Sequence, residues 1–201
     1  MPLERMLELD VIEAPAAAAL ALDPIKTRLL AALSQPASAA ALAGRVGLTR
    51  QKVNYHLRAL EDHKLIKPAE ERQWGGLTER LMIATASSYV VSPAALGPIG
   101  ADPARNNDRL SASYLIALAA RIVREVGDLW RTARQNDKRL ATLSIDTVIR
   151  FRSPADRAAF TSDLTNVVAA LAARYHDESA PGGRPHRLVV ASYPAPRDAR
   201  P

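Results

Sequence analysis

The fold is decided by residues 38–64, which read SAAALAGRVGLTRQKVNYHLRALEDHK. The pattern predicts a short helix, a tight turn at Gly47 and a longer helix that opens at Thr49, a residue type that caps helix N-termini well. Apolar side chains that would hold the two helices together recur through the stretch: Leu42, Val46, Leu48, Val53, Leu57 and Leu60. The spacing therefore predicts two helices packed across a sharp turn.

The second of these helices carries a run of polar and cationic residues on its first exposed turns. These are Arg50, Gln51, Lys52, Asn54 and Tyr55, with Arg58 one turn further along. Such side chains suit the edges of bases and the phosphates beside them, as in a helix-turn-helix whose second helix enters a major groove. A helical hairpin with a solvated polar face is the alternative that this segment alone leaves open.

A β-hairpin is predicted directly after the second helix. Leu65-Ile66-Lys67 leaves the helix, a polar stretch reaches Trp74-Gly75-Gly76-Leu77, and residues 78–85 have the pattern of a second strand. Gly75 and Gly76 supply the positive backbone dihedrals of a tight turn. Arg72 and Arg80 flank the tip, where they would meet phosphates or a minor groove, although either arginine taken alone is better explained as a solvated surface charge. Together the parts predict a winged helix.

Several segments resemble the arsenic-repressor (ArsR-like) winged-helix transcription factors over roughly residues 20–90. They are residues 23–30 (DPIKTRLL), 41–43 (ALA), 53–60 (VNYHLRAL) and Leu65-Ile66. The resemblance implies DNA binding through the residues at the family's DNA-reading positions: Thr49, Arg50, Gln51, Asn54 and Tyr55. It leaves two roles open for His56, a phosphate contact or helix packing. Soft-metal sensors of this family use cysteine thiolates, and this chain has no cysteine. Sensing of arsenic, cadmium or lead is therefore not implied.

Composition agrees with a polyanionic partner. The chain has 201 residues and a formal net charge of +6, which favours nucleic acid. The lack of cysteine excludes disulfides, thiol catalysis and thiolate metal sites, and fits a reducing compartment. The apolar stretch at residues 11–22 is too short to span a bilayer and is interrupted by Glu13 and Pro15. We expect a cytoplasmic protein with no membrane partner.

The chain is predicted to divide into five parts. Residues 1–22 form an N-terminal arm with a short helix at 16–20, and residues 23–91 form the winged helix-turn-helix, which begins with a helix capped by Asp23 and ends in a brief strand or connector at 89–91. Residues 92–105 contain several prolines and glycines and are predicted to be a linker. Residues 106–194 form a C-terminal module, and residues 195–201 a tail.

A long amphipathic helix is predicted from Asn106 to about Asp137. Its 32 residues would span about 48 Å, more than so small a domain needs. Part of its apolar stripe should therefore meet something outside its own domain, most simply a twofold-related copy. We assign dimerisation to Leu118, Ile122, Val126 and Leu129. Packing wholly within the same chain is the alternative.

The last sixty residues predict a strand–helix–strand unit. Apolar and polar residues alternate at 141–151, Ser153 and Pro154 open a helix, and residues 187–193 form a final strand. The helix has an apolar stripe of Phe160, Leu164, Val167 or Val168, Leu171 and Tyr175. Two parallel strands alone are marginal, so the sheet should gain strands from elsewhere or pack on the long helix.

No catalytic residue, cofactor or metal site is predicted. His176, Asp177, Glu178 and His186 form a histidine–carboxylate cluster on a loop without helical ligand spacing, which indicates a solvated loop more than a zinc site. The aromatic residues Tyr114, Trp130 and Tyr175 are more often core than the lining of a ligand pocket.

The sequence thus predicts a mainly helical α+β protein that is not an enzyme. Its predicted function is that of a sequence-specific, dimeric transcriptional regulator, a repressor, with double-stranded DNA and a second copy as partners. A small-molecule effector in the C-terminal module is left open. The alternative is a winged-helix module that binds other proteins without specific DNA binding.

Overall fold

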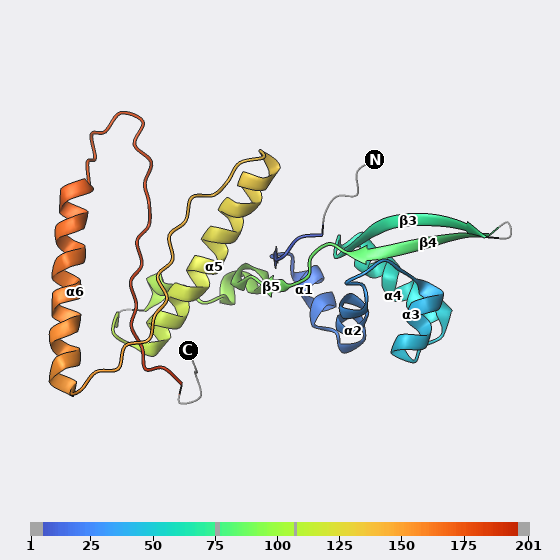
Figure 1. Ribbon diagram of the computed structural model, residues 1–201, viewed down its shortest axis with the longest axis horizontal. Coiled ribbons are helices and arrows are strands. Elements are labelled where there is room, and N and C mark those ends of the chain that lie inside the picture. Colours follow the sequence, from blue (N-terminus) through green and yellow to red (C-terminus); the bar gives the residue numbers. More distant parts are fainter. Residues whose placement is uncertain (1–5, 75–76, 107, 197–201) are drawn as a thin grey trace. The chain divides into compact units, whose positions relative to one another are not determined.

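The computed structural model describes residues 6–74, 77–106 and 108–196 and has a mainly helical α+β architecture (Figure 1). The chain divides into two compact units, Met1–Leu140 and Ala141–Pro201. The division therefore falls later than the linker predicted at 92–105. That segment forms two short 3₁₀ helices, η1 (Pro93–Ile99) and η2 (Pro103–Arg105), both of which contact the next helix, α5 (Ala112–Gln135), within the first unit.

The first two helices are α1 (Pro15–Leu22) and α2 (Pro24–Ala32), as the sequence predicts to within a few residues. Asp23 separates them. Its carboxylate accepts hydrogen bonds from the backbone N–H groups of Ile25 (2.9 Å) and Lys26 (3.0 Å), and this capping, from Lys26 above all, lowers the pKa of Asp23. Pro24 at the first helical position needs no hydrogen-bond partner for its nitrogen, so α2 can begin directly after Asp23.

The predicted helix-turn-helix is formed by α3 (Ala39–Val46) and α4 (Arg50–Asp62). Ser38 caps α3 by accepting from the N–H of Ala41, and Thr49 caps α4 by accepting from the N–H of Lys52. Gly47 ends α3 in the left-handed conformation (φ 69°), which a residue without Cβ adopts at little cost. Arg28 of α2 donates to the carbonyl of Val46 at 2.9 Å and so satisfies the end of α3.

The wing is the antiparallel hairpin of β3 (Ile66–Trp74) and β4 (Leu77–Ala84). A short strand, β2 (Ala37–Ser38), pairs with β4, so the sheet order is β2-β4-β3. A register shift between Pro68 and Glu70 marks a bulge in β3. The turn predicted at Gly75-Gly76 lies outside the described residues.

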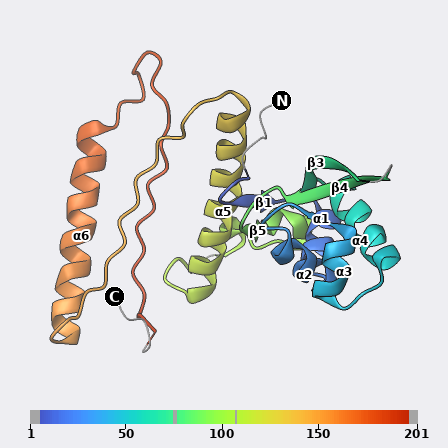
Figure 2. The ribbon, with the colours of Figure 1, turned by 45° about the vertical axis from the view of Figure 1, so that its right-hand side comes forward.

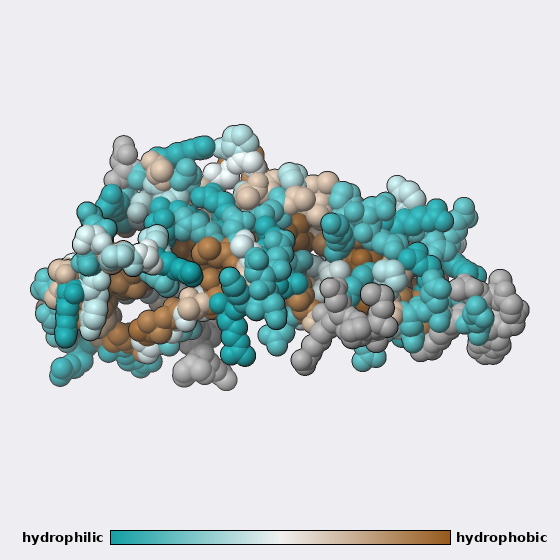
Figure 3. Space-filling model, turned by 90° about the horizontal axis from the view of Figure 1, so that it is seen from above, coloured by the Kyte–Doolittle hydropathy of each residue, from teal (hydrophilic) through white to brown (hydrophobic). Residues whose placement is uncertain are grey.

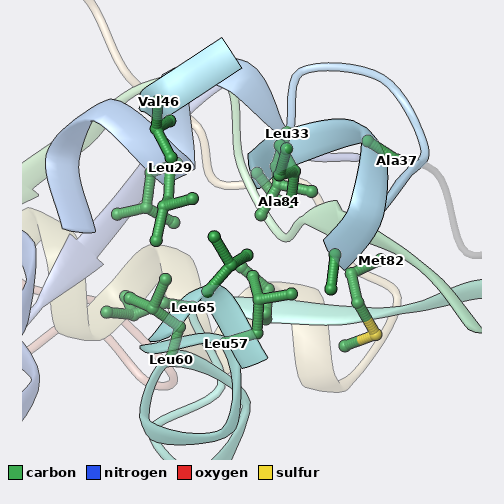
Figure 4. Close-up of a cluster of buried hydrophobic side chains, with 14 of the residues drawn as sticks. Leu29, Leu33, Ala37, Val46, Leu57, Leu60, Leu65, Met82 and Ala84 are labelled. Carbon is green, nitrogen blue, oxygen red and sulfur yellow. The ribbon is translucent and has the colours of Figure 1, made fainter. Parts of the chain in front are cut away.

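One hydrophobic core joins the helices to the base of the wing. Leu29, Leu33, Leu42, Val53 and Leu60 are fully buried, and Figure 4 shows side chains from α2, α3, α4 and the hairpin meeting in this cluster. Burial of a leucine side chain stabilises a fold by roughly 1.5–3 kcal/mol. The core therefore fixes the orientation of α4 relative to the wing.

The N-terminal arm is part of the first unit. Its strand β1 (Asp10–Ile12), which was not predicted from the sequence, pairs in parallel with β5 (Tyr89–Val91), so the brief strand predicted at 89–91 is confirmed. The hydroxyl of Tyr89 donates to the carbonyl of Leu65 (2.8 Å) and accepts from the N–H of Ala86 (3.1 Å). This contact ties the arm's sheet to the base of the wing.

Helix α5 is shorter than predicted, with 24 residues against 32. Ser111 accepts from the N–H of Tyr114 at 3.1 Å and caps the helix there, after a turn at residues 109–110. At 1.5 Å per residue α5 spans about 36 Å.

The second unit contains α6 (Pro154–Tyr175), which Ser153 caps as predicted by accepting from the N–H of Asp156. Residues 141–151 and 187–193 run in the same direction, opposite to α6 (Figures 1 and 2), but within the described residues neither forms the predicted strand. A strand needs a hydrogen-bonded neighbour, and two isolated parallel segments are marginal as a sheet.

Candidate nucleic-acid interface

Helix α4 has one buried and one exposed face. Val53, Leu57 and Leu60 are buried in the core. The predicted DNA-contacting residues of this helix are all exposed: Arg50, Gln51, Lys52, Asn54, Tyr55 and Arg58. The core therefore holds the helix by its apolar side and leaves a polar and cationic side free for a partner.

Five of these side chains meet at one surface concavity of about 630 Å³, lined by Arg50, Gln51, Asn54, Tyr55 and Arg58. Tyr55 is 72% exposed, which is unusual for an aromatic side chain that packs only within its own chain. Two guanidinium groups, two amides and a phenol offer several donors and acceptors along one side of a helix. The concavity combines charge for phosphates with groups that can pair with base edges.

The N-terminus of α4 adds a partial positive charge to this surface. Thr49 is exposed, and its hydroxyl oxygen accepts from the N–H of Lys52 at 3.3 Å. The other N–H groups of the first turn point out of the helix N-terminus, where aligned peptide dipoles favour an anion. A phosphate close to Thr49 would therefore be stabilised by both the dipole and Arg50.

His56 lies on the inner side of this surface. It is half-buried, its ring meets that of Tyr55 edge-on at 5.5 Å, and its Nδ1 atom is buried without a hydrogen-bond partner among the described residues. Of the two roles left open for His56, this placement favours helix packing.

Of the two wing arginines, the structure describes the side chain of Arg80 and only the backbone of Arg72. Arg80 makes a two-pronged ion pair with Glu61 of α4, with Nη2–Oε1 at 2.8 Å and Nη1–Oε2 at 3.5 Å. Arg72 pairs through its backbone with Glu79, and its side chain lies outside the described part of the chain. Glu61 was not predicted from the sequence, because it lies 19 residues from Arg80 and meets it only where the hairpin folds back along α4.

The four predicted dimerisation residues lie along α5. Leu118 and Ile122 are half-buried, whereas Val126 is 42% and Leu129 56% exposed. Another side of α5 packs within the first unit. A Cβ added to Gly127 would lie 3.1 Å from Cγ1 of Val11, and Arg131 donates to Glu13 at 2.8 Å. This hydrogen bond from Arg131 lowers the pKa of Glu13.

The remaining candidate side chains are dispersed. Tyr114 is half-buried, while the ring of Trp130 is covered by the Arg134 guanidinium at 5.3 Å. Tyr175 is 74% exposed. The exposed imidazole of His176 lies 3.5 Å from the carboxylate of Glu178. No group of three metal-binding side chains occurs in the part of the chain that the structure describes. Nor do those residues contain a helix long and apolar enough to cross a membrane.

A family model for a helix-turn-helix domain matches residues 22–69. The matched range runs from the cap of α2 through α3 and α4 into β3, so it contains every predicted contact residue on α4. No curated protein matches the chain. The chain thus contains a helix-turn-helix DNA-binding domain, which implies DNA as a partner, and the match covers only this part of it.

Proposed function

We propose that this protein is a sequence-specific, dimeric transcriptional regulator of the ArsR-like type. The observation that carries the proposal is the exposed face of α4, where five polar, aromatic and cationic side chains line one concavity on a helix held rigidly by its buried face. That arrangement suits a recognition helix lying in a major groove. Repression is the mode of regulation that we propose.

In the proposed complex the contacts on α4 divide into base reading and positioning. Gln51 and Asn54 read bases, since an amide can both donate to and accept from an adenine edge. Arg50 pairs with guanine or with phosphate, while Thr49, Lys52, Tyr55 and Arg58 hold the backbone. Phosphate contacts fix the register and carry no sequence information.

The wing adds affinity that does not depend on sequence. Arg72 and Arg80 neutralise phosphates, which releases counterions. Arg80 exchanges Glu61 for a phosphate when DNA binds, and this exchange is inexpensive because a half-exposed ion pair contributes only up to about 1 kcal/mol.

A second copy completes the reading of DNA. One helix-turn-helix contacts only a few base pairs, and dimers of such domains bind half-sites about 34 Å apart. We assign the apolar side of α5 that carries Leu118, Ile122, Val126 and Leu129, of which the last two are exposed, to this pairing. An apolar surface of this kind suits an interface between like copies.

The proposal is tested by selecting an operator from random duplexes and measuring binding by mobility shift. We expect Gln51→Ala and Asn54→Ala each to cost about 1–3 kcal/mol of binding free energy and to relax the preference at one or two positions. Gln135→Ala, the same change at the exposed end of α5, is the matched control and should bind like the parent. Parental binding by both α4 variants would disprove this placement of the recognition helix. A chain that binds no duplex at all would favour the protein-interaction alternative.

A further inference from the structure

The second unit has no hydrophobic core of its own. Not one described residue between 141 and 196 is buried. Many of its large apolar side chains are exposed: Leu143, Ile145, Val148, Ile149, Val167, Leu171, Tyr175, Leu188, Val190 and Tyr193. Hydrophobic atoms accordingly reach the surface in the part of Figure 3 that holds α6 and its flanking segments. A segment with these exposed residues must bury them elsewhere to fold stably.

The exposed apolar residues are spaced as they would be in a β-strand with one buried face, although these described residues form no sheet. In residues 141–151 all the apolar positions except Val148 share one side of an extended chain, and Leu143 and Ile145 on that side are 84% and 85% exposed. At the end of this side Phe151 packs its ring against Phe160 of α6, with 5.3 Å between the ring centres. The side that meets α6 at one end is therefore the apolar one, and it lacks a cover along the rest of its length.

The accessible area supports a missing partner. The chain exposes 15913 Å². A folded monomer of 21.7 kDa exposes about 9,000 Å², and two separate domains of these sizes about 11,000 Å². The excess accessible area of several thousand Å² is therefore enough to supply the roughly 1,000–2,500 Å² that each chain contributes to the interface of an obligate homodimer.

A second copy of residues 141–196 would supply the additional strands and the covering helix that one copy lacks. Two strands are marginal, whereas a sheet of three or more with one covered face is independently stable, and two copies supply four strands and two α6 helices. Charge does not oppose the pairing, because residues 141–196 hold six arginines and five acidic residues. That near balance suits self-association and gives no strong attraction to a nucleic acid.

We propose that residues 141–196 fold together with the same segment of a second copy. In this dimer, residues 141–151 and 187–193 become strands of one shared sheet, and the α6 helices cover its apolar face. The proposal rests on the proposed function in one respect, since it identifies the partner with the second copy that two half-sites require. It adds to the α5 contact a second interface in which folding and association are coupled.

Hydrogen exchange of the full chain, measured by mass spectrometry over a range of protein concentrations, tests the proposal. We expect amides of 141–151 and 187–193 to become protected only as the dimer forms, while the core of residues 22–69 stays protected at every concentration. Protection in the monomer would overturn the proposal, because the segment would then pack on its own chain. Absence of protection in a demonstrated dimer would overturn it as well.

A matched pair of variants gives an independent readout by sedimentation. Ile145→Asp places a charge on the apolar side of the strand and should weaken the dimer at least tenfold. Thr142→Asp places the same charge on the polar side of that strand and should leave the dimer unchanged. Exchange protection of residues 22–69 in both variants shows that the first unit still folds. Equal dimerisation of both variants and the parent contradicts the proposal.

The failure of this inference is distinguishable from failure of the proposed function. If the full chain binds its operator as a dimer but Ile145→Asp does not weaken that dimer, the shared sheet is wrong and the regulator stands. If protection at 141–151 follows dimerisation but no duplex DNA is bound, the shared sheet stands and the regulator is wrong.

Discussion

Lys64 has a backbone conformation that glycine usually adopts, with φ at 58°. It follows the last turn of α4, where the N–H of Leu65 donates to the carbonyl of Leu60 (2.9 Å) and the N–H of Lys64 to that of Glu61 (2.8 Å). This pair of bonds defines a Schellman motif. A Cβ in the left-handed region costs roughly 1 kcal/mol, so the C-terminal end of α4 carries strain.

We expect Lys64→Gly to raise the free energy of unfolding by about 0.5–1 kcal/mol, because glycine adopts this conformation without a steric penalty. Urea denaturation of the two proteins measures the difference. Lys64→Ala is the control, since it removes the same side chain and keeps the Cβ, and it should not stabilise the protein. A glycine variant less stable than the alanine variant would show that the strain is absent.

Substitutions of Arg80 and of Glu61 are expected to change the affinity for DNA in opposite directions. We expect Arg80→Ala to weaken specific and non-specific binding alike and to lower the slope of log affinity against log salt by about one. Glu61→Gln removes the competing carboxylate and should strengthen both kinds of binding by about twofold to fivefold, since exposed ion pairs contribute up to about 1 kcal/mol.

Fluorescence anisotropy against operator and random duplexes, at several salt concentrations, measures these effects. Glu178→Gln, an equal change of charge in the second unit, should leave affinity almost unchanged. Loss of specificity by Arg80→Ala at unchanged non-specific affinity would contradict the assignment of Arg80 to phosphate.

Residue roles were predictable from the sequence where they depend on near neighbours. The caps Thr49 and Ser153 accept from N–H groups three residues away, as Ser38 does too, so their signal is local and both predicted caps are confirmed. The partner of Arg80 is Glu61, which the hairpin brings close from 19 residues away. No local pattern encodes that pairing, and the same holds for Tyr89 and Leu65.

At the scale of elements, the packing of the N-terminal arm against α5 holds the first unit together beyond the helix-turn-helix. Gly127 allows α5 to approach Val11 of β1 closely, and Arg131 bonds Glu13 at the end of that strand. The arm in turn pairs with β5, which continues from the wing. Removal of the Glu13 carboxylate would therefore loosen both the arm and α5.

The ion pair between Glu13 and Arg131 predicts a pH dependence of stability. Arg131 lowers the pKa of Glu13 below its ordinary value of 4.5, so the ionised carboxylate stabilises the folded chain above that pH. The contribution disappears as pH falls through the lowered folded pKa, where the carboxylate becomes protonated. We expect Glu13→Gln to lower the free energy of unfolding by up to about 1 kcal/mol at pH 7 and to lower it by less at pH 3.

Denaturant titrations of parent and variant at both pH values measure this difference. Asp163→Asn, on exposed α6, is the control and should show no such dependence. A cost of Glu13→Gln that is equal at pH 7 and pH 3 would assign the interaction to packing instead of charge.

The elements themselves were predictable where periodicity and caps coincide, as in α3, α4 and α6. Helix α5 was predicted too long because the apolar spacing extends to residues before Ser111, whereas the N-cap Ser111 makes the helix begin at Ala112. Strand β1 was missed because Val11 and Ile12 lie at the start of an apolar stretch without alternation, and only pairing with β5 makes residues 10–12 a strand. Residues 141–151 show the converse: alternation alone forms no strand without a neighbour.

At the scale of the whole molecule, the two units differ in how much hydrophobic burial stabilises each of them. Residues 6–140 contain the buried core around Leu29, Leu33 and Leu42, whereas the described residues of 141–196 contain none that is buried. The first unit should therefore fold alone, and the second should depend on association. In the proposed dimer the two properties are connected, because affinity for an operator with two half-sites depends on dimerisation.

Two shortened chains separate the contributions to that dimer. A chain ending at Leu140 keeps α5 but lacks the second unit, so we expect it to fold, to dimerise at least tenfold more weakly than the full chain and to bind the operator correspondingly less well. A chain ending at Ser92 lacks α5 as well. It should be monomeric and bind DNA only weakly, because one recognition helix contacts too few base pairs.

Sedimentation over a range of concentrations decides the outcome, with the full-length Leu118→Glu variant as a companion. That change places an unpaired carboxylate on the apolar side of α5, which is strongly disfavoured in an interface. We expect it to yield monomers whose residues 22–69 still fold. A stable dimer of the chain ending at Ser92 would place the interface in the helix-turn-helix half, and the assignment of dimerisation to α5 would then be wrong.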